Sequence, residues 1–154
     1  FKVGLTILSL IVNSAFGFVL PTKKVDSACI LELSLGYSIE ISLSLAKAEN
    51  VTEQLKAEGI SASVVNMATI KPIDKDIIIN SAKKTGKVVT VEEHSVIGGL
   101  GSAVADVLIE NYPVKMKKVG VQDVFGESGT AAQLLTKFGL DGDGVYKSVK
   151  SFCE

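Results

Sequence analysis

The chain contains no arginine, so all 16 of its basic side chains are lysines. Arginine grips phosphates and carboxylates through a planar, two-pronged contact that lysine cannot make. Its absence counts against independent binding of a sugar phosphate by this chain. The lysines are spread along the sequence and the formal net charge is -1, so the sequence also lacks the basic face that nucleic acid requires.

Cysteine and histidine are equally scarce. The chain has two cysteines, Cys29 and Cys153, and one histidine, His94. Their separation matches neither a Cys-x-x-Cys pair nor the Cys/His spacing of zinc sites. We therefore expect two reduced thiols, no disulfide framework and no bound metal.

The first 26 residues form a region of their own. Val3 to Thr22 carries no charge and follows Lys2, which is the pattern of a signal peptide, with a cleavage point after Ala15. The Ser-Ala-Phe junction at 14–16 resembles the presequence that directs proteins into secondary plastids. We expect residues 1–26 to be a targeting-like leader, with entry to a plastid or the secretory pathway if it is real and a cytoplasmic location otherwise.

Two other interpretations of this leader stay open. A membrane-spanning helix needs about 20 apolar residues, and this run is interrupted by polar and glycine positions such as Thr6, Asn13 and Gly17. The second open interpretation is that residues 1–26 are an unrelated leader joined to the domain. Membrane contact is expected only if the leader is retained, and we leave residues 1–26 outside the fold.

Residues 27–154 have the composition of one folded domain, since the whole chain is 47% hydrophobic and 21% charged. Short apolar runs alternate with longer amphipathic stretches, as in strands joined by crossover helices. Strands are predicted at 28–34, 63–69, 88–92 and 116–121. Helices are predicted at 37–58, 75–85, 102–111, 130–138 and through Val145, Val149 and Phe152.

This alternation predicts an α/β fold, a three-layer αβα sandwich around a mostly parallel sheet of about five strands. Asp74 is a suitable N-cap for the helix at 75–85, and Gly59, Gly86 and Gly139 are suitable residues to end helices. The run at 88–92 is rich in valine, which is typical of a strand buried on both faces. We place that strand near the middle of the sheet.

The densest group of polar and glycine residues follows this strand. Ligand crevices of open α/β sheets lie at strand ends, glycines allow close approach, and a helix N-terminus attracts anions. The sequence therefore predicts an interface or ligand-binding turn, although its glycine spacing is a poor match to a dinucleotide fingerprint. The residues of this turn are Glu92, Glu93, His94, Gly98, Gly99, Gly101 and Ser102.

His94 could act as a general acid or base, because its unperturbed pKa lies near neutrality. Neighbouring side chains of a strand point to opposite faces, however, so Glu93 and His94 do not easily share one pocket. We favour a structural or interface role for His94 and predict no catalytic residue in this chain.

A second polar turn follows the strand at 116–121. Its glycines indicate unusual backbone angles, and Glu127 could orient a neighbouring loop, while the simpler interpretation is a loop that caps the next helix. The residues of this turn are Phe125, Gly126, Glu127, Ser128 and Gly129.

Several ordered segments resemble the C-terminal domain of transketolases. The stretch 61–74 is similar to the family's second strand and following loop, 89–104 to its most recognisable segment, and 119–129 to the segment after that. With 36–40 opening the first helix, the likeness spans about 28–154. The related 1-deoxyxylulose-5-phosphate synthases and 2-oxoacid dehydrogenase beta subunits share this domain, but His94 and the turn at 125–129 look more like transketolase.

The resemblance implies two-carbon ketol transfer between sugar phosphates on thiamine diphosphate, in the pentose phosphate pathway. It implies that the cofactor and a divalent metal are bound by other domains, so this chain alone binds neither. The partners it implies are a complementary transketolase chain or domains, assembled around a dimer. A stand-alone module binding a small ligand or nucleotide at 98–102 is the alternative from another class.

Overall fold

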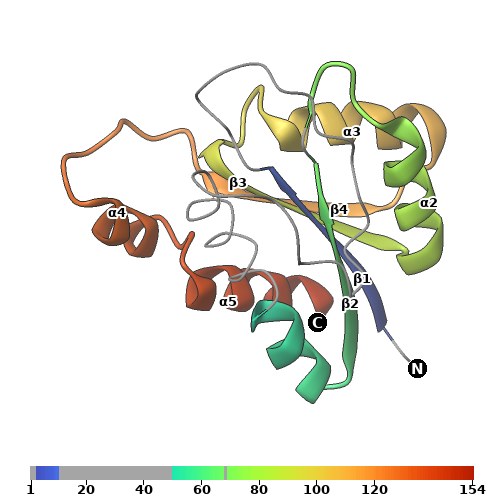
Figure 1. The fold of residues 1–154 in the computed structure, drawn as a ribbon, viewed down its shortest axis with the longest axis horizontal. Helices are drawn as coiled ribbons and strands as arrows, with labels where there is room; N and C mark the ends of the chain where they lie inside the picture. Colours follow the sequence, from blue (N-terminus) through green and yellow to red (C-terminus); the bar gives the residue numbers. More distant parts are fainter. Residues whose placement is uncertain (1–2, 11–49, 68) are drawn as a thin grey trace, which may run out of the picture.

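The computed structural model describes residues 3–10, 50–67 and 69–154. Four parallel strands form one sheet in the order β2-β1-β3-β4 (Figure 1). The strands are β1 (Val3–Leu10), β2 (Ile60–Asn66), β3 (Lys87–Ser95) and β4 (Lys115–Val121). The labelled helices are α2 (Lys75–Thr85), α3 (Leu100–Asn111), α4 (Ala131–Lys137) and α5 (Gly142–Cys153), and residues 50–57 are also helical.

Helices cover both faces of the sheet, so the predicted three-layer αβα sandwich is confirmed. Val88 and Val89 are adjacent in β3 and both fully buried, and they belong to different core clusters. This follows from the two-residue period of a strand. The cluster around Val88 includes residues of α2 and α3, whereas the cluster around Val89 includes residues of α5 and of the helix at 50–57.

The local signals for α2 act as the sequence predicts. The Asp74 side chain accepts a hydrogen bond from the backbone N–H of Ile77 at 3.0 Å, and Gly86 ends the helix with a φ of 72°. Only glycine adopts that left-handed conformation without a steric penalty. The predicted bounds of 75–85 are therefore confirmed.

The predicted central position of β3 is also confirmed, since this strand lies between β1 and β4. It runs on to Ser95 instead of ending at Glu92, with an irregularity in its pairing to β4 between Val91 and Ser95. Strand β2 begins and ends three residues before the predicted range of 63–69. Such boundaries are the least certain part of a pattern-based prediction.

The sheet differs from the expectation at its N-terminal strand. Val3–Leu10, which we left outside the fold, forms β1 between β2 and β3. A short apolar run has the same pattern in a buried parallel strand as in the apolar part of a signal peptide, so the sequence alone did not separate the two. The targeting role of residues 1–26 stays a prediction.

The described residues contribute four strands, against about five expected. The strand predicted at 28–34, and most of the helix predicted at 37–58, lie outside the described residues. The end of that helix is described, and Gly59 follows it with a φ of 82°. Within the described ranges, no helix is long and apolar enough to cross a membrane.

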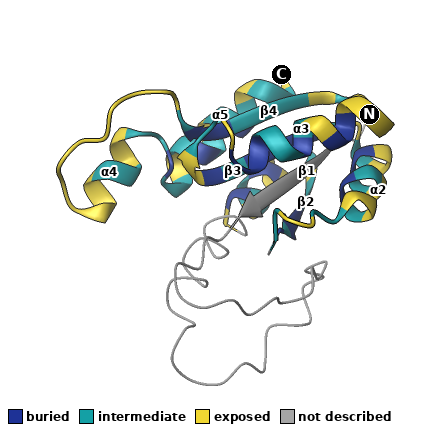
Figure 2. Cartoon of the chain, turned by 90° about the horizontal axis from the view of Figure 1, so that it is seen from above, coloured by how far each residue is buried: buried dark blue, intermediate teal, exposed yellow. Residues whose placement is uncertain are grey.

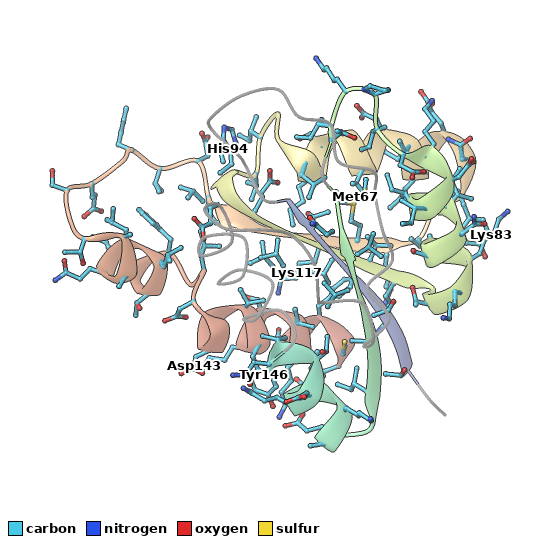
Figure 3. The ribbon with its side chains drawn as sticks, in the orientation of Figure 1. Met67, Lys83, His94, Lys117, Asp143 and Tyr146 are labelled. Atoms are coloured by element: carbon cyan, nitrogen blue, oxygen red, sulfur yellow. The ribbon has the colours of Figure 1, made fainter. Side chains whose placement is uncertain are left out.

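Two lysines join α5 to the sheet. Lys87 Nζ of β3 donates to the Cys153 carbonyl at 2.9 Å, and Lys117 Nζ of β4 donates to the Ser148 carbonyl at 2.9 Å; Lys117 is labelled in Figure 3. A cation near the carboxyl end of a helix also complements the helix dipole. Burial raises the pKa of the Cys153 thiol, so this free cysteine is a poor nucleophile.

A surface cluster joins the helix at 50–57 to α5. Glu58 accepts hydrogen bonds from the Tyr146 hydroxyl and from Lys150 Nζ, the latter at 2.9 Å. These two bonds hold the pKa of the Glu58 carboxyl below its usual value, and the same carboxylate raises the pKa of Tyr146 and of Lys150. All three groups therefore keep their ordinary charge states at neutral pH.

Candidate site at the carboxyl edge of the sheet

Glu92 closes the junction between β3 and α3 from inside the domain. Its side chain is 1% exposed. Its two carboxylate oxygens accept hydrogen bonds from the backbone N–H groups of Leu100 at 2.7 Å and Gly101 at 2.9 Å. Residue Gly99, at the N-cap of α3, provides no side-chain cap, so Glu92 supplies the cap from eight residues upstream.

This arrangement corrects the expected anion site. The sequence predicts that the free N–H groups at the start of α3 attract an anionic ligand. In the structure a carboxylate of the chain itself occupies this position, where the helix dipole favours a negative charge. Glu92 is therefore a buried structural group, and it does not belong to the exposed contact surface predicted for it.

Two glycines allow the close packing at this junction, Gly99 against the Glu92 carboxylate and Gly101 against Lys118 and Thr90. A Cβ atom on Gly99 would lie 2.1 Å from Glu92 Oε2, and one on Gly101 would lie 2.8 Å from Lys118 Cδ. Neither distance is compatible with a side chain. Gly98 has a φ of 75°, so it turns the chain in a conformation that other residues avoid. The glycine-rich turn is shaped by the internal contact.

Glu93 and His94 follow Glu92 and are both exposed. His94 Nδ1 lies 3.1 Å from the Ser95 carbonyl oxygen, and Figure 3 places His94 at the end of β3. The alternation expected of a strand places the Glu92 side chain in the core and Glu93 in solvent. The structure shows no hydrogen bond or ion pair between Glu93 and His94 among the described residues, so the local acid/base pair receives no support.

Lys118 also belongs to this junction, although it is not among the residues that the sequence pattern indicates. Its Nζ donates to the Val96 carbonyl at 3.3 Å and to Ser102 Oγ at 3.2 Å. The Ser102 hydroxyl also accepts the backbone N–H of Gly98 at 3.0 Å. Lys118 therefore joins β4 to the turn and to α3. A signal was present in the sequence, because Lys118 directly precedes the apolar end of the predicted strand at 116–121, where a lysine needs a partner.

The second predicted turn belongs to a longer exposed segment, Gln122 to Lys137, which we call the arm. All residues from 122 to 133 are exposed, and α4 at its end has no buried residue. Figures 1 and 2 show the arm projecting beyond the sheet. A hydrogen bond of 3.0 Å from the Val96 N–H to the Val121 carbonyl joins the base of the arm to the glycine-rich turn.

The arm has a defined local structure. Asp123 adopts a φ of 42°, a left-handed conformation in which aspartate is enriched. Glu127 forms an ion pair with Lys137. Thr130 and Gln133 form a capping box at the start of α4, which satisfies N–H groups that the helix leaves free. The expectation that this turn caps the next helix therefore applies to Thr130, just beyond Phe125–Gly129.

Comparison with known proteins decides the family. The family described as "Transketolase, C-terminal domain" matches residues 38–145, more than half of the chain. The chain belongs to the transketolase C-terminal domain family. The resemblance that the sequence segments indicated is confirmed, together with the fold it implied.

Individual relatives agree with this assignment. The chain is 46% identical over 112 residues to the 6-deoxy-6-sulfo-D-fructose transketolase subunit of a Clostridium species, a match that covers 73% of this chain and 35% of that protein. It is 35% identical over 117 residues to a 1-deoxy-D-xylulose-5-phosphate synthase of Heliobacterium modesticaldum, covering 75% of this chain and 18% of that protein.

A solved structure is similar over nearly the whole chain. It is described as a split gene transketolase, an inactive beta4 tetramer, and it aligns with a TM-score of 0.72 and 42% sequence identity, covering 99% of this chain and 40% of that one. The transketolase C-terminal chain described here thus spans two fifths or less of the lengths of these relatives.

The described residues of this transketolase domain do not fit thiamine diphosphate and its metal. The N-terminus of α3, where a diphosphate would be favoured, already holds the Glu92 carboxylate, and a second anion there would meet its negative charge. In residues 3–10, 50–67 and 69–154, no group of three His, Cys, Asp or Glu side chains is arranged to hold a metal ion. We assign no catalytic step to this junction.

Proposed function

We propose that this chain is the C-terminal part of a thiamine-diphosphate-dependent transketolase that transfers a two-carbon ketol unit between sugar phosphates. In this proposal the chain supports assembly and does not catalyse the transfer alone. The observation that carries the proposal is the family match over residues 38–145 in a chain that covers only 35% of a relative named as a transketolase subunit.

The geometry of the carboxyl edge supports an assembly role. Two charged side chains at this edge, Glu92 and Lys118, form their hydrogen bonds within the domain. What the edge presents outward is the exposed part of the turn, with Glu93 and His94, and the arm. Loops held by a rigid scaffold are the usual place for contacts with other domains.

The proposal is tested by reconstitution. The full chain is combined with the N-terminal and pyrimidine-binding transketolase domains encoded in the same genome, and transfer from a ketose phosphate to an aldose phosphate is measured. Transfer is expected only with both components present, with each component alone as control. Transfer by this chain alone would overturn the proposal.

A second candidate reaction has its own support, because the chain is 35% identical to a 1-deoxy-D-xylulose-5-phosphate synthase over 75% of its length. The reconstituted assembly is therefore also assayed for 1-deoxy-D-xylulose-5-phosphate. Formation of that product without ketol transfer would assign the chain to a synthase. The nucleotide-binding alternative has less support, because Glu92 occupies the helix end that a phosphate would use.

A further inference from the structure

We infer that the arm is the element by which this chain docks onto the complementary transketolase polypeptide, with Phe125 as its apolar anchor. The inference rests on the proposed function, since it names the partner of the same edge of the domain. The partner surface that receives the arm is an apolar socket with basic residues at its rim, on the polypeptide that carries the other transketolase domains.

Phe125 is the starting observation. Its side chain is 97% exposed and its neighbour Val124 is 55% exposed. Across the hydrogen bond at the base of the arm, the glycine-rich turn presents Ile97, which is 61% exposed. Single exposed apolar residues are ordinary, but a phenylalanine at the tip of a projecting segment leaves an area of roughly 150–250 Å² in water.

The arm is organised before anything covers it. The Glu127–Lys137 ion pair and the capping box at Thr130 give it local contacts of its own, and Asp123 at its base has a φ of 42°. Residues 122–133 of the arm are nevertheless all exposed, and its contact with the core of its own domain is through Leu135 in α4. Preorganised anchors reduce the entropy cost of association, which is the property expected of a docking element.

The charge at this edge indicates the chemistry of the partner. The lysines of this edge have partners: Lys118 donates to the Val96 carbonyl and to Ser102 Oγ, and Lys137 is paired with Glu127. Glu92 is buried, so the exposed carboxylates outside that ion pair are those of Glu93 and Asp123. Complementary charge guides association and selects partners, so the apolar anchor and its acidic surroundings fit a socket with lysine or arginine at its rim.

A second exposed apolar site provides the matched control. Ile109 on α3 is 72% exposed, but it belongs to a helix that packs on the sheet. Its neighbours there form contacts within the domain: Lys83 lies over the Tyr112 ring at 5.9 Å, and Lys75 pairs with Glu110 at 3.9 Å. A change at Ile109 therefore removes exposed apolar surface without touching the arm.

The test measures binding of the full chain to the polypeptide carrying the N-terminal and pyrimidine-binding domains from the same genome. Phe125→Ser is expected to raise the Kd at least tenfold, as for a central aromatic anchor, and Ile109→Ser to change it less than twofold. Asp123→Asn is expected to weaken binding mainly at low salt. Circular dichroism of each variant verifies that the fold is kept.

The outcomes separate the docking inference from the proposed function. Tight binding and ketol transfer by the original chain, with Phe125→Ser equal to it in Kd, would overturn the docking role alone. Loss of self-association in Phe125→Ser, with binding to the complementary polypeptide unchanged, would assign the arm to a second copy of this chain and also overturn the inference. No binding by the original chain would remove both proposals.

Discussion

The glycine-rich turn and the arm leave the sheet at the same edge, and each combines glycines with acidic residues. The turn is closed by a buried contact, whereas the arm is exposed to solvent. In the turn, the carboxylate of Glu92 is buried and bonded to α3, so the glycines serve a contact inside the domain. In the arm, Gly126 has open space around it and Phe125 lies in solvent. Similar composition therefore accompanies a closed structural junction in one place and an open surface in the other.

The largest effect is expected from Glu92→Ala. It removes the acceptor of two N–H groups and leaves them buried without a partner, which costs about 1–3 kcal/mol for each group. Urea unfolding of the full chain measures the loss. Glu93→Ala, one residue along and exposed, should stay within about 0.5 kcal/mol. Equal effects of the two variants would contradict the buried role of Glu92.

A glycine pair sharpens the same contrast with a smaller effect. Gly99→Ala places a methyl group 2.1 Å from Glu92 Oε2 and should destabilise the chain by about 1–3 kcal/mol through overpacking. Gly126→Ala meets no atom within 4 Å and should change the unfolding free energy by less than about 0.5 kcal/mol. A tolerated Gly99→Ala would mean that the turn can open without loss.

The smallest effect is expected in the arm itself. Thr130→Ala removes one half of the capping box of α4, at a local cost of about 1 kcal/mol. Since α4 has no buried residue, the change should accelerate amide exchange in residues 131–137 while the urea midpoint of the domain stays nearly constant. A parallel shift of the global midpoint would show that the arm is part of the core.

Local signals made much of the fold predictable. Asp74 caps α2 and Gly86 ends it as expected, because capping depends on residues within a few positions of the helix end. The valine-rich β3 was placed inside the sheet, because a run of buried residues on both faces has a recognisable composition. The N-terminal strand was not, since the apolar sequence of Val3–Leu10 fits two interpretations.

The candidate site was located from the sequence, but its internal organisation was not. The role of Glu92 depends on a contact with residues eight and nine positions later, which no local propensity encodes. The two-residue period of β3 does not separate Glu92 from Glu93, because Val88 and Val89, one in each phase, are both fully buried. Lys118 likewise acquires its role only when β4 lies beside the turn.

The bond between Lys87 and the end of α5 indicates where a label can be attached to this chain. Lys87 lies at the beginning of β3 and bonds to the carbonyl of Cys153, so the polypeptide leaves its last helix at the end of the sheet opposite the turn and the arm. A fluorophore or immobilisation tag attached after Glu154 would therefore point away from the surface where a companion is expected to land. A label attached to the arm would instead block the binding of the complementary polypeptide that it is intended to detect.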